Sequence, residues 1–201
     1  MNTRVKISVL LVGLGVLLAF IRGGSERSFR MKPDELTAKV TAENLFTVDE
    51  VVRFVNTEDS TVQLVDVRSA AEYRACNIPG SVNIPLENLT ETGWESALNR
   101  ENVRTIFYSN DDLLASVAQT IATGMGNENV FVMKGGLNEW FATVMLSEFS
   151  GETISARENA LFENRLKARA AFNQINSLPD SLKNKYFDAK RLQQKKLDGG
   201  C

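Results

Sequence analysis

Three short apolar runs, each followed by a helix-forming segment, constrain the fold of this chain most strongly. The runs are rich in β-branched and aromatic residues: Val62–Val67, Thr105–Tyr108 and Val130–Met133. Nearly continuous apolar runs of this length are typical of strands buried in a parallel sheet. Helices are predicted after them, over Ser69–Arg74, Leu113–Ala122 and Leu137–Leu146. Alternating strands and helices predict an α/β fold, whose functional loops follow the carboxyl ends of strands.

Helix starts are marked by capping-box patterns, in which a Ser or Thr is followed three residues later by an acidic residue. The pattern occurs at Thr47–Glu50, Ser109–Asp112 and Ser155–Glu158. We therefore expect helices to begin at these three places. The second of them follows directly after the strand that ends at Tyr108.

Short motifs accompany the first strand, the turn after it and the helix that follows the third strand. They are Asp66-Val67-Arg68, Glu72-Tyr73, Ile78-Pro79-Gly80, Asn83-Ile84-Pro85 and Gly135-Gly136…Trp140. In this order the motifs closely resemble the rhodanese (sulfurtransferase) family, over roughly residues 45–145. The resemblance implies the family's fold. It also implies structural roles for Asp66, Arg68, Glu72, Gly80, Gly135, Gly136 and Trp140.

The loop after Tyr108 departs from the family at three points. The resemblance places a cysteine nucleophile and a closing arginine where this chain has Ser109 and Leu114. A hydroxyl needs a base to act as a nucleophile, and the arginine would have supplied a positive donor. Asp111 and Asp112 add negative charge, which repels the thiosulfate-like anions that the family binds. We therefore expect helix capping rather than catalysis from the whole loop, which is Ser109, Asn110, Asp111, Asp112, Leu113 and Leu114.

The composition removes several other classes of function. The chain has no histidine, which excludes histidine-based triads and imidazole metal ligands. A net charge of −2 provides no general attraction to nucleic acid. The adjacent acids Asp111 and Asp112 are a weak metal signal without further ligands. We expect no metal, no cofactor and no nucleic-acid partner.

The N-terminus contains an uncharged apolar stretch, residues 7–21, with basic residues on both sides. As a helix it would be about 22 Å long, shorter than the roughly 30 Å apolar core of a bilayer. A small-x-small cleavage site does not follow it, so we favour an uncleaved signal anchor over a cleaved signal peptide. We expect residues 7–21 to contact a membrane. Because the start is signal-like, we favour a body outside the cytoplasm.

The resemblance stops at about residue 150. Apolar residues recur at helical spacing from Leu161 to Ile175 and again from Leu182 to Leu192. Pro179 lies in the first turn of the second segment, where proline is tolerated. The pattern predicts a helical hairpin that packs on the domain or on a partner. The chain then ends in a Gly-Gly-Cys tail that we expect to be mobile.

Two cysteines, Cys76 and Cys201, are the candidate persulfide-bearing thiols. Cys76 takes the place of a glycine of the family's pattern, and we favour a buried small residue over a relocated reactive thiol. Cys201 follows a Gly-Gly hinge and a basic run, and nearby cations lower the pKa of a thiol. A sulfur carrier and an incidental terminal residue are equally open for Cys201.

The sequence thus predicts a rhodanese-like parallel sheet flanked by helices, with an N-terminal signal-anchor helix and a C-terminal helical hairpin. The predicted divisions are residues 1–22 (anchor), 23–44 (linker), 45–148 (rhodanese-like domain) and 149–201 (helical extension). We expect a membrane-anchored, catalytically degenerate module that binds or regulates a partner protein. The alternative is a persulfide carrier or sulfurtransferase that uses Cys201 or Cys76.

Overall fold

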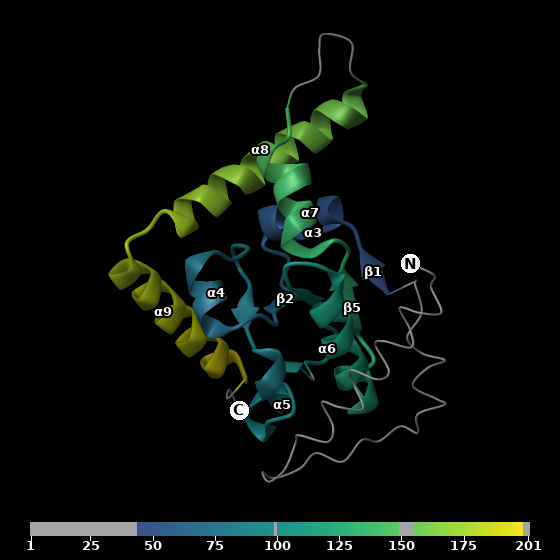
Figure 1. Cartoon of the computed structure of the whole chain (residues 1–201), viewed down its shortest axis with the longest axis vertical. Coiled ribbons are helices and arrows are strands. Elements are labelled where there is room, and N and C mark those ends of the chain that lie inside the picture. Colours follow the sequence, from purple (N-terminus) through teal and green to yellow (C-terminus); the bar gives the residue numbers. More distant parts are fainter. Residues whose placement is uncertain (1–43, 99, 149–154, 199–201) are drawn as a thin grey trace.

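A five-stranded, wholly parallel sheet lies at the centre of the chain (Figure 1). The computed structural model describes residues 44–98, 100–148 and 155–198. The strands, in the spatial order β1-β5-β4-β2-β3, are β1 (Leu45–Phe46), β2 (Val62–Asp66), β3 (Val82–Asn83), β4 (Arg104–Tyr108) and β5 (Val130–Met133). The predicted parallel sheet is confirmed. The two short edge strands, β1 and β3, are not among the strands predicted from the sequence.

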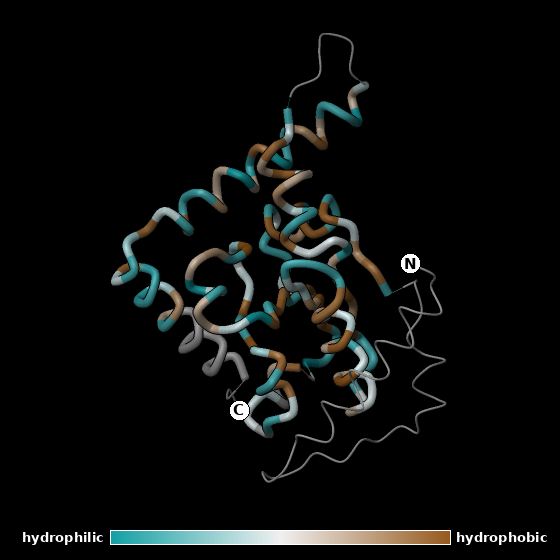
Figure 2. The backbone as a smooth tube through the Cα atoms, in the orientation of Figure 1, coloured by the Kyte–Doolittle hydropathy of each residue, from teal (hydrophilic) through white to brown (hydrophobic). Residues whose placement is uncertain are grey.

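Two hydrophobic cores cover the two faces of the sheet. Leu64 and Ile106 are register partners and face one core, whereas their neighbours Val65 and Phe107 face the other. The first core is completed by the helices α3 (Val48–Thr57), α7 (Gly136–Trp140), η3 (Phe141–Met145) and α8 (Ala156–Asn176). The second is completed by α5 (Glu95–Leu98) and α6 (Asp112–Gly124). Figure 2 shows hydrophobic residues, in brown, among the central strands, whereas hydrophobic and hydrophilic residues alternate along the helices.

Capping boxes begin α3, α4 (Ala70–Ala75) and α8. Thr47 pairs with Glu50, Ser69 with Glu72 and Ser155 with Glu158, and in each pair the side chains accept from both backbone N–H groups. The helix starts predicted at Thr47 and Ser155 are therefore confirmed.

The capping box predicted at Ser109–Asp112 is wrong. The N-cap of α6 is Asp111, whose carboxylate accepts a hydrogen bond from Leu113 N at 2.9 Å. Asp111 has an extended backbone (φ −137°, ψ −166°), so the helix begins only at Asp112. Ser109 lies too early in the chain to cap it, and its hydroxyl donates to the carbonyl of Asp111 instead.

The helix predicted over Leu137–Leu146 has two parts. Residues Gly136–Trp140 form an α-helical turn, and Phe141–Met145 continue as the wider π-type turn η3. Arg169 of α8 donates to the carbonyls that end this segment, at 2.9 Å to Val144 O and 2.5 Å to Ser147 O. A side chain of the hairpin thus stabilises the widened turn. Two short 3₁₀ turns, η1 (Leu86–Asn88) and η2 (Thr92–Trp94), complete the described elements.

The predicted C-terminal hairpin is confirmed. It consists of α8 and α9 (Asp180–Asp198), and in Figure 1 it runs along the outside of the sheet domain. On α8, Arg165 makes a bidentate ion pair with Asp49 of α3, with N–O distances of 2.7 and 2.6 Å. On α9, the ring of Phe187 lies 5.1 Å from that of Tyr73 on α4. The hairpin packs on the domain itself.

The predicted membrane anchor, residues 7–21, lies outside the described residues, as does the linker before Asn44. Within the ranges that are described, we find no helix that is both long enough and apolar enough to span a bilayer.

Candidate functional site

Two neighbouring strands end side by side at the candidate site. Asp66 is the last residue of β2 and Tyr108 the last of β4, and the two are register partners. The segment after Asp66 contains Arg68, and the loop after Tyr108 begins with Ser109. Parallel strands place their carboxyl ends at one edge of the sheet, so these two segments meet there.

Asp66 and Arg68 form a buried ion pair at this edge. Arg68 Nη2 lies 2.6 Å from Asp66 Oδ2, Arg68 Nε lies 3.0 Å from Oδ1, and the backbone N–H of Arg68 also donates to Oδ1. Burial raises the pKa of the Asp66 carboxyl, against the opposing effect of its hydrogen bonds with Arg68. Burial lowers the pKa of the Arg68 guanidinium, but the hydrogen bonds with Asp66 and its charge together raise it by more. The pKa of Arg68 is therefore above its usual value. Arg68 is therefore a permanent cation whose charge is matched by Asp66.

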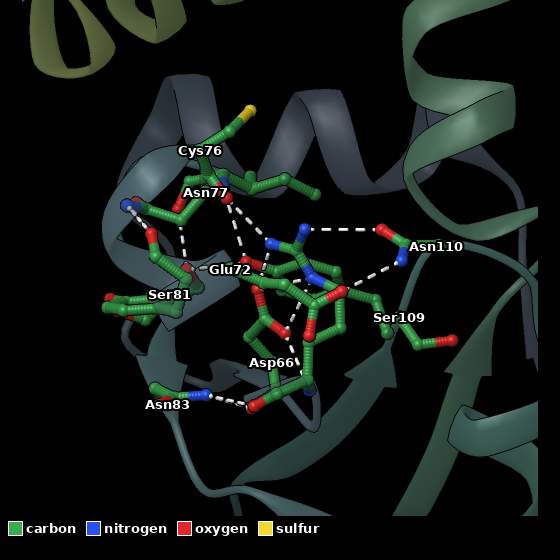
Figure 3. A network of polar contacts seen from close by, with 12 residues as sticks. Asp66, Glu72, Cys76, Asn77, Ser81, Asn83, Ser109 and Asn110 are labelled. Atoms are coloured by element: carbon green, nitrogen blue, oxygen red, sulfur yellow. Dashed lines mark hydrogen bonds and ion pairs between the residues drawn. The ribbon is translucent and has the colours of Figure 1, made fainter. Parts of the chain in front are cut away.

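Arg68 also connects two other segments, the end of α4 and the loop after β4 (Figure 3). Its Nη2 donates to the carbonyl of Cys76 at 2.6 Å, and its Nη1 donates to Asn110 Oδ1 at 3.2 Å. Asn110 Nδ2 in turn donates to Glu72 Oε1 at 3.2 Å. The structure thus brings together four of the residues singled out in the sequence, which are Asp66, Arg68, Glu72 and Asn110. Their contacts are structural ones that tie the ends of β2 and β4 to α4.

Ser109 stands at the nucleophile position of the family pattern, with no solvent exposure. Its hydroxyl donates a 2.5 Å hydrogen bond to the carbonyl of Asp111, and its own carbonyl accepts from Leu137 N at 2.9 Å. The next carbonyl, of Asn110, accepts from Asn138 N at 3.0 Å. The proton of the hydroxyl is therefore directed to a backbone carbonyl, which cannot act as a base.

The glycine pair holds this loop against the start of α7. Gly136 has a φ of +55°, and a Cβ placed there would lie 2.6 Å from the carbonyl oxygen of Ser109. Gly135 has a φ of +75°, and its N–H donates to the carboxylate of Asp112. A glycine is needed at position 136 for this close approach. Both positions also have a left-handed backbone, which residues other than glycine adopt rarely. The two glycines thus let the loop pack closely against the start of α7.

Acidic and apolar side chains make up the part of the loop that follows Asn110. The carboxylate of Asp111 accepts from Leu113 N, and that of Asp112 accepts from Gly135 N. Leu113 and Leu114 project from the first turn of α6 and are 54% and 41% exposed. Within the part of the chain that is described, we find no group of three or more Cys, Asp or Glu positioned to hold a metal ion.

The remaining predicted site residues lie apart from this network. Cys76 directly follows α4 as its C-cap, and its side chain is half-buried, with the sulfur pointing away from Asp66 in Figure 3. Burial raises the pKa of the Cys76 thiol, although the charge of Arg68 opposes the rise. Gly80 has a φ of +87° in the turn before β3. Trp140 is fully buried in the core beneath α8. Cys201 lies outside the described residues.

Several residues of the site region have no role in the sequence-based prediction. The hydroxyl of Tyr108 accepts from Ile78 N at 3.2 Å and lies 2.8 Å from Ser81 Oγ, and complete burial raises the pKa of the Tyr108 phenol well above its ordinary value. Lys183 of α9 is buried, with its Nζ 3.5 Å from the carbonyls of Arg74 and Ala75. Tyr108 could have been identified from the sequence by its position at a strand end. No local sequence pattern identifies Lys183.

Comparisons with known proteins agree with this geometry. The rhodanese-like domain model matches residues 47–143. A thiosulfate:glutathione sulfurtransferase of Saccharomyces cerevisiae is 28% identical over 105 residues, which cover 47% of this chain and 76% of that protein. The human centrosomal protein of 41 kDa is 34% identical over 85 residues, which cover 39% of this chain and 23% of that protein. This chain thus matches less than a quarter of the length of the human relative.

Among the solved structures that this chain resembles is a single-domain sulfurtransferase of Saccharomyces cerevisiae. It has 25% sequence identity and a TM-score of 0.41, and the match covers 51% of this chain and 91% of that one. The family match, the thiosulfate:glutathione sulfurtransferase relative and the parallel sheet lead to one conclusion: residues 47–143 of this chain form a rhodanese-like domain.

Proposed function

We propose that this chain is a catalytically degenerate rhodanese-like module, anchored to a membrane by residues 7–21, that binds or regulates a partner protein. The main support for this proposal is that the loop after Tyr108 contains carboxylates that already bind nearby backbone N–H groups. Carboxylates of Asp111 and Asp112 accept the N–H groups of Leu113 and Gly135. An anionic sulfur would have to compete with these two internal anions for positive donors.

The charge around the loop further disfavours sulfur transfer. Arg68 contacts Asn110 of the loop, but its charge is matched by the buried carboxylate of Asp66. Leu114 stands where the resemblance implies a second cation. A thiosulfate-like anion would therefore meet two exposed carboxylates, and the guanidinium of Arg68, which contacts the loop, is already paired with Asp66.

A thiol elsewhere in the described structure is poorly suited to replace the missing cysteine. The pKa of Cys76 is raised by burial, which lowers its thiolate fraction, and the thiolate is the nucleophilic form. Its sulfur also points away from Asp66 at the end of β2. This supports a binding role over a relocated sulfur-transfer site at Cys76.

Sulfur loading of the full-length chain tests the proposal. The detergent-solubilised protein is incubated with thiosulfate or glutathione persulfide, and its intact mass is measured before and after cyanide. We expect no mass gain of one sulfur that cyanide removes, whereas an active rhodanese in the same assay gains and loses it. A cyanide-sensitive gain that maps to Cys76 or Cys201, and disappears in Cys76→Ser or Cys201→Ser, would make the chain a sulfur carrier and overturn the proposal.

The membrane anchor has its own test. We expect the full-length chain to remain in the membrane fraction during alkaline carbonate extraction, because an apolar segment without charges is stabilised in the bilayer core. Replacing Leu11 and Leu14 by Asp within residues 7–21 should release it, whereas replacing the flanking Arg22 by Asp should not. Release of the unaltered chain by carbonate would contradict the anchor.

A further inference from the structure

The first turn of α6 exposes two adjacent leucines that its own core does not require. Leu113 and Leu114 are 54% and 41% exposed, whereas the helix is anchored in the core by Ala115, Ala118 and Ile121, all of which are essentially inaccessible. Both leucines lie at the carboxyl edge of the sheet, at the end of the loop that begins at Ser109. Exposed leucines are common singly, but an adjacent pair at the functional edge of the sheet provides apolar area for a contact.

Carboxylates from three segments lie around the loop that precedes this pair. Asp111 and Asp112 precede the leucines in the loop, Glu72 reaches the loop from α4 through Asn110, and Glu139 follows the Gly135 turn that binds Asp112. A hydrogen bond with the side chain of Ser69 lowers the pKa of Glu72, which keeps this carboxyl ionised.

Positive charge at this edge is smaller. Arg68 is buried and paired with Asp66, whereas Lys134 beside the Gly135 turn and Arg74 on α4 are exposed. The four exposed carboxylates of these segments thus outnumber their two exposed cations. The surface formed by Leu113, Leu114, Asp111, Asp112, Glu72 and Glu139 is called the leucine–acid surface below.

The backbone beneath the leucine–acid surface is held in place. The carbonyls of Ser109 and Asn110 accept from Leu137 N and Asn138 N, and Gly136 allows the two segments to approach closely. A surface that is already ordered loses little conformational entropy when it binds. The loop could therefore bind a partner without first becoming ordered.

We propose that the leucine–acid surface binds a peptide segment of a partner protein in which apolar side chains lie between lysines or arginines. The proposal rests on the proposed function and names the class of partner that this edge of the domain accepts. Apolar residues of the partner would cover Leu113 and Leu114, and its cations would lie opposite the surrounding carboxylates.

Fluorescence anisotropy with the full-length chain in detergent tests this. The probe is a fluorescein-labelled nine-residue peptide with two central leucines, two lysines on each side of them, and serine elsewhere. We expect Leu113→Ser/Leu114→Ser to weaken its binding about tenfold. Asp111→Asn/Asp112→Asn should weaken it several-fold and reduce its salt dependence. Asparagine keeps the capping ability of position 111.

Matched controls are Leu146→Ser, which removes an exposed leucine elsewhere, and Glu163→Gln on α8. Neither should change the dissociation constant. The proposal is overturned if the peptide does not bind, if a lysine–serine peptide without leucine binds as tightly, or if Leu146→Ser weakens binding as much as the loop variant. Self-association of the chain that disappears in Leu113→Ser/Leu114→Ser would also overturn it, because a second copy would then be the occupant.

The result of the peptide-binding test can be told apart from the result of the sulfur-loading test. Sulfur loading at a cysteine together with peptide binding would reject the degenerate-module proposal and keep the leucine–acid surface. Absence of both would keep the degenerate module and reject the surface.

Discussion

The side-chain amide of Asn176 pairs with both backbone groups of Asn77, 99 residues away. Asn77 N donates to Asn176 Oδ1 at 3.0 Å, and Asn176 Nδ2 donates to Asn77 O at 2.9 Å. Asn77 directly follows Cys76, whose carbonyl is bound by Arg68. The end of α8 is therefore connected, through one residue of the chain, to the ion pair at the candidate site.

Asn176→Ala should destabilise the whole domain, not the hairpin alone. Two partly buried backbone groups of Asn77 would lose their partner, which costs about 1–3 kcal/mol in the free energy of unfolding. Urea unfolding followed by circular dichroism measures this. Asn173→Ala, at an exposed position on the same helix, is the control and should change the free energy by less than about 0.5 kcal/mol. Equal effects of the two substitutions would show that the pairing with Asn77 does not stabilise the fold.

The capping boxes predict loss of stability in acid. Hydrogen bonds with the side chains of Thr47 and Ser69 lower the pKa values of Glu50 and Glu72 below 4.5 in the folded state. A carboxyl whose pKa is lowered by folding contributes stability above its unfolded pKa, and loses it as the pH falls through the folded pKa. The free energy of unfolding should therefore decrease as the pH falls below about 4.5.

Glu72→Gln isolates one of these contributions. The difference in unfolding free energy between the unaltered chain and Glu72→Gln should be largest near neutral pH and should shrink in acid, as measured by thermal unfolding between pH 3 and pH 7. A difference for Glu72→Gln that stayed constant across this pH range would exclude the capping interaction as its origin.

A thiol introduced at position 109 should be unreactive. Ser109 has no solvent exposure, and two carboxylates follow it in the loop, so Ser109→Cys in a Cys76→Ser/Cys201→Ser background should resist both iodoacetamide and thiosulfate. Leu113→Cys in the same background is the control, because Leu113 is 54% exposed. We expect Leu113→Cys to be alkylated at least about tenfold faster under native conditions. Similar alkylation rates at the two positions, or sulfur loading at position 109, would show that the loop opens.

Much of the fold could be predicted from the sequence because its signals are local. Continuous apolar runs gave the three central strands, and capping boxes gave the starts of α3 and α8. The edge strands β1 and β3 have only two residues each, too few for a periodic pattern to be visible. The π-type turn η3 could not be predicted, because it is held by Arg169 from a helix that follows it.

The site was predictable as a set of motifs but not as a set of contacts. Asp66, Arg68 and the glycine pair were identified from family-like spacing. The misplaced capping box shows the limit of such patterns, since Ser109 and Asp111 are both good caps and only the extended backbone at Asp111 decides between them. The contacts of Asn176 and Lys183 with the α4 segment depend on where the hairpin packs, which no local pattern contains.

Removal of the guanidinium of Arg68 should be among the most damaging single substitutions. Arg68→Met would leave the buried carboxylate of Asp66 without its cation, and would also leave the Cys76 carbonyl without its donor. Loss of one partner of a buried ion pair costs about 3–5 kcal/mol. The free energy of unfolding in urea measures the cost, with Arg53→Met at an exposed position as the control. Asp66→Leu/Arg68→Met should be less destabilised than Arg68→Met alone, because the unpaired charge is then absent. If the double variant were the less stable of the two, the damage would come from lost packing and backbone contacts rather than from the orphaned carboxylate.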